Sequence, residues 1–408
     1  MTQTLQPMRE PPCKVLYVNH SSKIAGAEQC LLRLMRSLDR SRYEPFLVCP
    51  DGELVIEAHR RDVPVFHLSF LDYQSNRSTI AGITIPNPFL ALWNMVKVTV
   101  MGWKIGEIAR RESIDIIHAN SLLTRLPACI AGKIAGVAVV WHVRDILSSK
   151  YWLAVYDFMS ARLVARLITV SNACHIQFSN LSNVITVYDG IDSEAFKWDE
   201  QAALKVRKSF GWDEQHTVFG IFGRISKTKG HDHFVRAAII VHERYRMTRW
   251  LVVGEAWNPE EQRFLSDLRI QASEAGLEQD LIFTGFRSDV NEVMSACDVV
   301  VVPSVIQDSF PNTVLEGMAC SRAILAFPVG GIPEAIDDGI TGLLVKRMDG
   351  EGLAEAEMLL VDDPMLRQRL GREARKRVVA CFNMQQTQEG IERVYQEIID
   401  ASRHQERY

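Results

Sequence analysis

The sequence predicts an α/β protein built from two doubly wound domains with parallel sheets. Short apolar runs alternate with longer amphipathic stretches along nearly the whole chain, and this pattern restarts near the middle. Parallel strands need long crossover connections, so strands that alternate with helices indicate parallel sheets covered by helices. The length of 408 residues agrees with more than one domain, because a domain commonly takes about 150 residues.

The first half of the chain carries the strands of the first domain. A strand is expected at 15–19, followed by a helix at 27–38 in which apolar side chains recur at helical spacing. Further strand-like runs follow at 45–49, 64–68, 114–118, 137–142, 168–170 and 184–187.

The second half repeats the pattern. Its strand-like runs lie at 217–222, 250–253, 281–283, 299–302 and 323–327. The polar and charged stretch 191–212 separates the two series, and the helices from Pro364 onward have no strand between them. We therefore expect domains at 1–195 and 196–385 and a final helix at 386–408.

Composition excludes several classes of protein. Acidic residues number 50 and basic residues 46, a net charge of −4 that argues against a dedicated nucleic-acid binder. The eight cysteines occur singly and form no CxxC pair, which fits small core residues in a reducing compartment rather than a metal site. The first ten residues lack the apolar core of a secretory signal, so a cytoplasmic protein is expected.

The apolar stretch 89–108 is expected to be a helix and not a membrane span. Charged residues within it are too costly for a lipid-exposed span. Its Trp93 and Trp103, with Arg110 and Arg111 nearby, fit a peripheral contact with the inner face of a membrane. They also fit an ordinary helix packed on the sheet, and the loop at 73–88 could instead shape a pocket for a soluble acceptor.

Ligands of doubly wound sheets bind where strands end and helices begin, and a cleft between two such domains is the natural site. Gly26 follows the first strand and precedes a helix, where a backbone can approach a phosphate. On its own it also fits a tight turn. The GxGxxG fingerprint is absent here, which argues against a nicotinamide or flavin dehydrogenase.

Two cations follow the first strand of the second series, in FGRISKTKG at 222–230. Arg224 offers a planar fork and Lys229 a point charge, and together they suit a diphosphate. A solvated basic loop is the alternative.

The segment 303–334 is the richest in polar groups. Asp308 and Glu316 are separated by seven residues, and Asn312 is expected to cap a helix whose N-terminus beside Phe310 and Pro311 would bind a phosphate. A carboxylate at Glu316 can accept hydrogen bonds from a ribose diol. Both acids also fit ordinary solvated helix residues. A second loop follows at 330–331.

His118 and His142 each end a predicted strand, so both are expected at the same edge of the first sheet. Arg144 and Asp145 make a polar site near His142 plausible, and a hydrogen-bonded histidine near the core is the alternative. The chain carries no Ser–His–Asp signature, P-loop, HExxH or DxD motif.

These blocks together resemble glycosyltransferase family 4, a retaining family with the GT-B fold. The resemblance spans about residues 14–400 and rests on GAE at 26–28, His142, YDGID at 188–192, GRISKTKG at 223–230, and DSFPNTVLEGMA through GGIPEAI at 308–336. It implies two Rossmann-like domains facing across a cleft, the first for the acceptor and the second for a nucleotide-sugar donor. It also implies that the final helix crosses back to the first domain.

The resemblance assigns roles to individual residues. Arg224 and Lys229 would bind the donor diphosphate, Glu316 the ribose, the loop Gly285–Arg287 the base, and Gly26 would lie under the diphosphate. The implied catalytic residues are His142, Asp308, Arg224 and Lys229. The implied donor-binding residues are Gly26, Gly223, Arg224, Lys229, Gly285, Phe286, Arg287, Ser309, Phe310, Pro311, Asn312, Thr313 and Glu316.

This chain departs from the family pattern at four places. Asp308 stands where glutamate is more common, and Asp189 replaces an asparagine. Ser321 replaces the glycine of an ACG sequence at 319–321, and Ala25 replaces a glycine before Gly26. Asp308 is one methylene shorter than glutamate, so the sugar would sit differently.

The implied activity is retaining transfer of a hexose from a UDP- or GDP-sugar to a glycan, lipid-linked or small-molecule acceptor in cell-surface polysaccharide or glycoconjugate synthesis. No cofactor and no metal are expected, because two fixed cations replace the metal of a DxD motif. The alternatives are a GT-B nucleotide-sugar epimerase and a non-catalytic regulatory subunit that binds a nucleotide-sugar.

Overall fold

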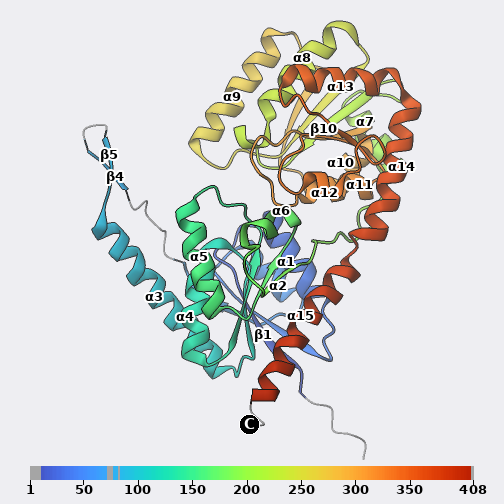
Figure 1. Ribbon diagram of the computed structural model, residues 1–408. Coiled ribbons are helices and arrows are strands. Elements are labelled where there is room, and N and C mark those ends of the chain that lie inside the picture. Colours follow the sequence, from blue (N-terminus) through green and yellow to red (C-terminus); the bar gives the residue numbers. More distant parts are fainter. Residues whose placement is uncertain (1–10, 71–76, 81–82, 406–408) are drawn as a thin grey trace, which may run out of the picture. The chain divides into compact units, whose positions relative to one another are not determined.

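The computed structural model describes residues 11–70, 77–80 and 83–405, and these form two α/β units (Figure 1). The N-terminal unit contains the described residues up to Val170, together with His175–Val187 and the chain from Gln388. The C-terminal unit contains Ser171–Cys174 and Tyr188–Thr387. The predicted fold class, an α/β protein with two doubly wound parallel sheets, is confirmed.

The N-terminal unit has a seven-stranded parallel sheet in the order β3-β2-β1-β6-β7-β8-β9. The order reverses between β1 and β6, and such a reversal leaves a crevice at the carboxyl ends of the two strands. The strands are β1 (Cys13–Val18), β2 (Tyr43–Cys49), β3 (Val65–His67), β6 (Ile116–Ala119), β7 (Ala138–Val143), β8 (Arg166–Thr169) and β9 (Val184–Thr186).

The helices of this unit connect successive strands, as right-handed parallel crossovers require. They are α1 (Gly26–Ser37), α2 (Glu53–His59), α3 (Pro88–Arg111), the 3₁₀ turn η1 (Leu122–Thr124), α4 (Arg125–Ala135), α5 (Lys150–Leu163) and the 3₁₀ turn η2 (Ile176–Phe178). The short helix α6 (Asn172–His175) begins in the other unit.

The C-terminal unit has a six-stranded sheet in the order β12-β11-β10-β13-β14-β15, which reverses between β10 and β13. Its strands are β10 (Thr217–Phe222), β11 (Thr248–Val253), β12 (Leu281–Gly285), β13 (Val299–Val302), β14 (Ala323–Ala326) and β15 (Leu343–Leu344). Its helices are α7 (Glu200–Ser209), the 3₁₀ turn η3 (Lys227–Lys229), α8 (His231–Arg244), α9 (Pro259–Glu274), α10 (Val290–Ala296), α11 (Asn312–Ala319), α12 (Ile332–Ala335), α13 (Gly350–Asp362) and α14 (Pro364–Cys381).

The last helix, α15 (Met384–Gln405), closes the core of the N-terminal unit. Its Ile391, Val394, Tyr395 and Ile398 recur at helical spacing, and their buried side chains pack in one cluster with Tyr17 of β1. This stripe explains why the end of the chain belongs with its beginning.

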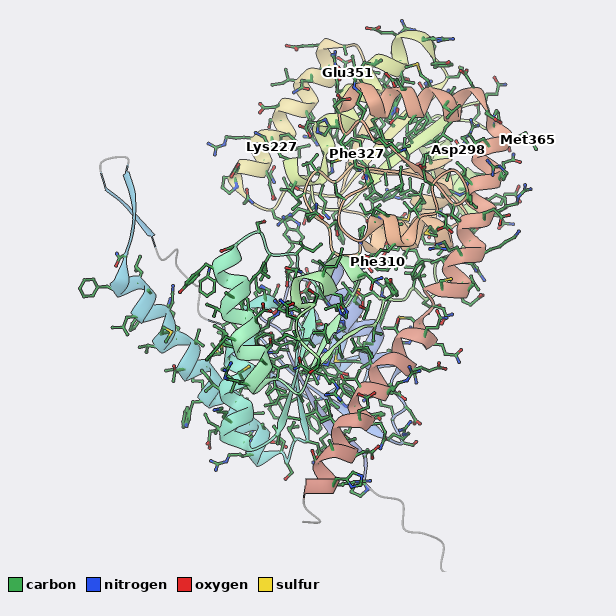
Figure 2. All side chains as sticks on the ribbon, viewed as in Figure 1. Lys227, Asp298, Phe310, Phe327, Glu351 and Met365 are labelled. Atoms are coloured by element: carbon green, nitrogen blue, oxygen red, sulfur yellow. The ribbon has the colours of Figure 1, made fainter. Side chains whose placement is uncertain are left out.

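The core of the C-terminal unit lies between its sheet and helices. Phe219, Trp250 and Phe327 are wholly buried there. Figure 2 labels Phe327 of this core and Met365, which is exposed. Parallel strands are covered on both faces, so their side chains are apolar in continuous runs, as in the four valines of β13.

Two features differ from the sequence prediction. The described part of the loop expected at 73–88 contains an antiparallel pair, β4 (Arg77–Ile80) and β5 (Ile83–Pro86), whereas 73–76 and 81–82 lie outside the described residues. β15 was not predicted, because two residues show no periodicity. The first ten residues, from which a cytoplasmic location was predicted, also lie outside the described part. None of the helices in the described chain has the length and apolarity to cross a bilayer.

Candidate functional site

The crevice of the C-terminal sheet lies between the loops that follow β10 and β13. These strands are parallel neighbours, with Phe219 opposite Val299. Beyond their ends the two loops stay in contact, because the Val305 amide donates to the Thr228 carbonyl at 3.1 Å. Residues 223–230 and 303–311 therefore occupy the position at which doubly wound sheets bind ligands.

Gly230 allows this contact. Its φ is +73°, and a Cβ there would stand 1.9 Å from the Pro303 carbonyl oxygen. Only glycine fits, since it lacks a Cβ and adopts positive φ without strain. The close approach places Lys229 beside Asp308, and the Lys229 Nζ donates to Asp308 Oδ2 at 2.6 Å.

The cations of this crevice already have carboxylate neighbours. Lys229 is 38% exposed and Asp308 13% exposed, so the pair lies at the surface of the crevice. The Arg224 guanidinium lies 5.1 Å from the Trp257 ring centre, and its Nε is 3.4 Å from Glu261 Oε1. An incoming diphosphate would compete with these carboxylates for both cations.

The helix after β13 differs from the prediction at its first residue. α11 begins at Asn312, and Pro311, not Asn312, occupies the N-cap position, so no side chain caps the helix. The predicted cap is therefore wrong, because proline supplies a fixed extended backbone just before the helix but no side-chain acceptor. Glu316 lies one turn inside α11 and is buried, with 7% of its surface exposed.

Neighbouring segments hold the backbone before α11 in place. The buried Phe310 ring packs against Tyr188 and Phe382, with ring centres 5.2 and 5.4 Å away. From the other side, the Gly331 amide donates to the Asp308 carbonyl at 2.8 Å. Ser309–Thr313, which were predicted to bind the donor, therefore directly follow Asp308, the partner of Lys229, along the chain.

The loop after β12 lies at the same carboxyl edge but two strands away from β10. Gly285 ends β12 at φ +74°, and Phe286 is 71% exposed. Arg287 Nε donates to Asp289 Oδ1 at 2.7 Å, and this hydrogen bond lowers the pKa of Asp289. The loop predicted to bind the base therefore lies at the same edge of the sheet as Lys229. Among the described residues, no hydrogen bond or ion pair joins this loop to Lys229.

The two strand-end histidines of the N-terminal unit lie in contact. His118 Nε2 and His142 Nδ1 are 3.1 Å apart, and both side chains are buried. Burial, and then the Arg144 charge, lower the pKa of His118 to about 3 and that of His142 well below its ordinary value. Both imidazoles are therefore neutral at physiological pH.

Gly26 begins α1 after the extended Ala25, as the sequence predicted for the end of the first strand. Glu28, two residues after Gly26, accepts two hydrogen bonds at this turn. Its Oε2 accepts from the Ala25 amide at 3.1 Å, and its Oε1 accepts from Asn19 Nδ2 at 3.0 Å. Asn120 Nδ2 donates to Asn19 Oδ1 at 3.0 Å, which links the ends of β1 and β6.

Sequence reasoning missed Asn19, Glu28 and Asn120. A signal was present, because each asparagine directly follows a buried strand and the glutamate stands in the first turn of the next helix. Glu28 satisfies amide groups at a helix start, which is the ordinary role of a carboxylate there.

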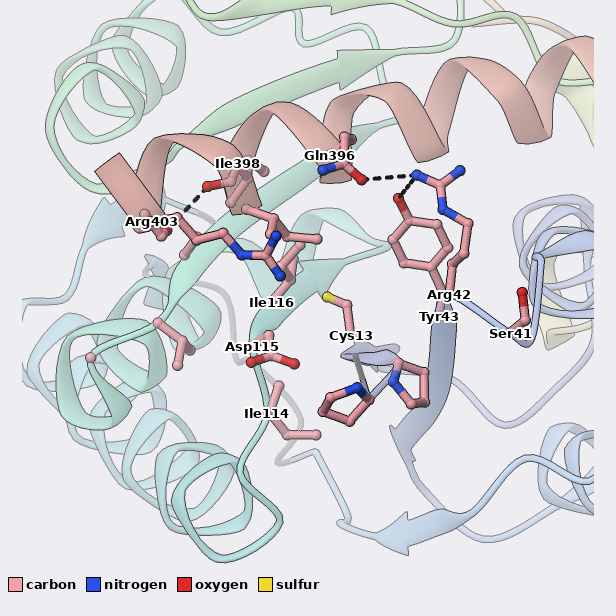
Figure 3. Close-up of a pocket in the computed structure, with 17 residues that line it drawn as sticks. Cys13, Ser41, Arg42, Tyr43, Ile114, Asp115, Ile116, Gln396, Ile398 and Arg403 are labelled. Atoms are coloured by element: carbon pink, nitrogen blue, oxygen red, sulfur yellow. Dashed lines mark hydrogen bonds between the residues drawn. The ribbon is translucent and has the colours of Figure 1, made fainter. Parts of the chain in front are cut away.

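A cavity of ≈ 750 Å³ lies at the opposite edge of the N-terminal sheet (Figure 3). Cys13, Ile116 and Ala138, at or near the amino ends of their strands, line it together with residues of α15. Active sites of such sheets lie at the carboxyl ends, and none of the predicted site residues lines this cavity. Among the residues that the structure describes, no three His, Cys, Asp or Glu side chains group as a metal site would need.

Comparisons with known proteins agree with this architecture. Residues 24–195 match the family model described as Glycosyltransferase Family 4, and residues 216–363 match the model described as Glycosyl transferases group 1. In overall structure the chain resembles HepE of Anabaena in its crystal structure with UDP-glucose. The TM-score is 0.80 at 24% identity, over 94% of this chain and 99% of that one, and this likeness shows the predicted GT-B fold.

Two curated relatives are more similar in sequence. The chain is 34% identical to alpha-maltose-1-phosphate synthase of Mycobacterium tuberculosis over 308 residues, which are 67% of this chain and 76% of that protein. It is also 34% identical to D-inositol 3-phosphate glycosyltransferase of Saccharomonospora viridis over 226 residues, 54% of this chain, and spans 51% of that protein's length. The chain therefore belongs to glycosyltransferase family 4.

Proposed function

We propose that this protein is a retaining glycosyltransferase that moves a hexose from a nucleotide-sugar to an acceptor hydroxyl. The observation that carries the proposal is the Lys229–Asp308 pair at the β10–β13 crevice, with Arg224 on the same loop as Lys229. The crystal structure of HepE with UDP-glucose supports a UDP-sugar as the first donor to test. A GDP-sugar is the second.

The donor would occupy the crevice of the C-terminal unit. Arg224 and Lys229 would offset the negative charge that develops on the leaving diphosphate. Asp308, released from Lys229, would accept a hydrogen bond from a hydroxyl of the sugar. Glu316 would hold the ribose, and the loop Gly285–Arg287 would contact the base.

Retention needs no enzymic base far from the leaving group. The bond between the anomeric carbon and the phosphate oxygen breaks, and the acceptor oxygen bonds to the same face. The leaving phosphate oxygen takes the proton of the acceptor hydroxyl. Because Arg224 and Lys229 supply the positive charge, we expect the reaction to proceed without a metal ion.

Nucleotide release from a panel of UDP-, GDP- and ADP-sugars, each with Mg²⁺ or with EDTA, tests this proposal. Lys229→Met should lower turnover by about 10²- to 10³-fold, the usual loss for one fixed charge-stabilising group. Lys227→Met removes a cation from the same turn, where Lys227 lies 5.8 Å from the Phe264 ring, and should retain activity. Glu316→Ala should weaken donor binding.

Equal losses of activity in the two lysine variants would overturn the proposed donor site. A strict need for Mg²⁺ would overturn the metal-free reaction. Two alternatives predict other results. An epimerase would release nucleotide and an altered sugar without any acceptor. A regulatory subunit would bind a nucleotide-sugar and turn none over.

We also propose that α3 contacts an anionic lipid surface. Its exposed Phe89, Trp93, Val96, Val100 and Trp103 recur at alternate steps of four and three residues, which places them along one face.

The opposite face of α3 is already covered. Met101, Ile105 and Ala109 are buried, and Gly102 lets α4 approach so closely that a Cβ would stand 2.5 Å from Ile130 Cβ. Between 88 and 106 the helix carries Lys97 and Lys104 and no acidic residue. Tryptophans on an apolar face flanked by lysines suit a membrane with negative headgroups, and would bring a lipid-linked acceptor to the enzyme.

Co-sedimentation with vesicles tests this contact. The wild type should bind vesicles that contain phosphatidylglycerol and should bind pure phosphatidylcholine less. Replacing Trp93 and Trp103 with serine together should abolish binding, whereas Trp198→Ser, at an exposed tryptophan of the C-terminal unit, should not. If the double variant instead alters self-association and wild-type vesicle binding is absent, the face is a protein interface.

A further inference from the structure

The loops that follow β10 and β11 run side by side at the carboxyl edge of the C-terminal sheet. The Gly223 amide donates to the Val253 carbonyl at 2.9 Å, and the Ile225 amide donates to the Glu255 carbonyl at 3.0 Å. Arg224 stands between the two donors of the first loop, so these backbone hydrogen bonds fix it beside the second loop.

Two side chains from the region after β11 contact Arg224. Its guanidinium carbon lies 5.1 Å from the centre of the Trp257 ring. Its Nε lies 3.4 Å from Oε1 of Glu261, whose side chain is 11% exposed. Within the part of the chain that the structure describes, Nη1 and Nη2 of Arg224 make no hydrogen bond. These two nitrogens, which can donate side by side to one anion, are therefore available to a ligand.

The start of α9 holds Glu261 in place. Asn258 caps this helix, and its Oδ1 accepts from the Glu261 amide at 2.9 Å. The second carboxylate oxygen of Glu261, Oε2, accepts from the Trp257 amide at 2.8 Å. One oxygen thus fixes the loop that carries the indole, while the other faces Nε of Arg224. Both supports of the guanidinium therefore depend on one carboxylate.

We infer that Trp257 and Glu261 are positioning residues that hold Arg224 ready to bind a diphosphate through Nη1 and Nη2. The inference rests on the proposed function, because the diphosphate is that of the nucleotide-sugar. A diphosphate can compete with Glu261 for the charge of Arg224 without displacing it, since the two anions contact different nitrogens. A side chain that is already oriented loses less conformational freedom when the ligand binds.

Glu261→Gln separates positioning from simple electrostatics by the sign of its effect. Glutamine has one side-chain oxygen, so its NH₂ group must face either the Trp257 amide or Arg224, both of which are donors. The variant also removes a negative charge, which by itself would tighten the binding of an anion. We expect the affinity for UDP, measured by titration calorimetry on the full-length protein, to fall by about tenfold. This is the lower end of what loss of a supporting partner costs at metal sites.

Glu260→Gln is the matched control. Glu260 lies beside Glu261 in the first turn of α9, and its side chain is exposed. The substitution removes the same charge, and the affinity for UDP should stay within about threefold of the wild type because salt screens exposed charges. Unchanged or tighter binding in Glu261→Gln would overturn the inference. A loss of the same size in both variants would do so too, because it would follow from the charge alone.

The role of the indole is tested in the same way. Trp257→Leu should weaken UDP binding by about two- to fivefold, and Trp257→Phe should recover part of this loss because phenylalanine keeps an aromatic face for the cation. Trp198→Leu is the control, since Trp198 is also exposed and its ring centre lies 5.4 Å from the guanidinium of Arg322, just before β14 at the other edge of the sheet. Its affinity should not change. Equal effects of the two leucine variants would overturn the role of Trp257.

A measurement without nucleotide distinguishes failure of this inference from failure of the proposed function. The fluorescence of Trp257 is obtained by subtracting the spectrum of Trp257→Phe from that of the wild type, and each further variant is paired with its own Trp257→Phe partner. Arg224→Leu removes the charge from the ring and Glu261→Gln loosens it, so both should shift the Trp257 emission, whereas Glu260→Gln should not. Emission that is unchanged in Arg224→Leu would overturn the positioning. The expected shifts without any binding of UDP or GDP would instead overturn the proposed donor site, and with it the role of Arg224 toward a diphosphate.

Discussion

At the residue scale, the candidate donor crevice depends on the backbone at Gly230. We predict that Gly230→Ala destabilises the C-terminal unit by about 1–3 kcal/mol more than Gly211→Ala does, because its new Cβ meets the Pro303 carbonyl as well as requiring a positive φ. Gly211 has nearly the same φ, +74°, and nothing within 4 Å of its Cβ position. Thermal and urea unfolding of the two variants measure the difference, and equal losses would show that the close approach carries no energy.

A second prediction at this scale concerns pH. Glu357 is wholly buried, the Trp250 Nε1 donates to its Oε2 at 3.0 Å, and burial raises its pKa from 4.5 to about 8. Between these values the folded protein holds a proton that the unfolded chain has lost. The contribution to stability is therefore complete below about pH 4.5 and declines as the pH rises towards 8.

Glu357→Gln keeps the acceptor for Trp250 but cannot titrate. The wild type should lose up to about 1.4 kcal/mol of unfolding free energy per pH unit relative to this variant between about pH 5 and 8. Urea unfolding of both proteins across this range gives the difference directly. Parallel curves would show that Glu357 does not hold its proton in the folded state.

The sequence predicts the parts of the crevice that lie next to strands. Lys229 and Asp308 are 79 positions apart, yet both follow strands whose carboxyl ends had to share an edge, so their pairing follows from the topology. Tyr395 is 277 positions from His118. No local pattern links these two residues, because their contact depends on which face of which sheet the last helix covers.

At the scale of elements, apolar runs in the sequence predict the strands that are covered on both faces of a sheet. The predicted 217–222 and 299–302 agree with β10 and β13 at both ends. β15 is only two residues long and exists because β14 offers it a hydrogen-bonding edge. A strand of this kind is defined by its neighbour, so composition cannot reveal it.

The stripe on α15 leads to a prediction about that helix. Ile391 is wholly buried against the sheet of the N-terminal unit, so Ile391→Ala should destabilise this unit by about 2–5 kcal/mol, the range for large-to-small core substitutions. Arg393, on the exposed side of the same helix, provides the control, and Arg393→Ala should change stability by less than about 0.5 kcal/mol. Thermal unfolding measures both, and similar losses would mean that α15 is not part of the core.

At the scale of the whole molecule, the alternation of strands and helices predicts two units but not how the chain is shared between them. Ser171–Cys174 lies within the N-terminal half of the sequence and yet belongs to the C-terminal unit. There Glu334 accepts hydrogen bonds from the Asn172 and Ala173 amides at 2.7 and 2.8 Å. A few tertiary contacts decide which unit such a short segment joins, and these contacts leave no periodic pattern in the sequence.

Because the chain is divided in this way, the two units depend to different degrees on its last residues. The sheet of the C-terminal unit and the helices on it lie within 188–387, whereas the N-terminal unit takes Ile391, Val394 and Tyr395 into its core. Removing residues 388–408 would expose apolar side chains of the first sheet and leave Tyr17 without its hydrogen-bond partner. We therefore predict that this truncation unfolds the N-terminal unit and spares the other.

Limited proteolysis with identification of the products by mass spectrometry measures this outcome. In the truncated chain, cleavage should be rapid at sites before residue 170, and a resistant fragment starting near Tyr188 should persist. The intact Arg393→Ala chain under the same conditions should resist cleavage in both units. Rapid loss of both units would show that the C-terminal unit needs the folded N-terminal unit, and resistance of both would show that the first sheet is stable without α15.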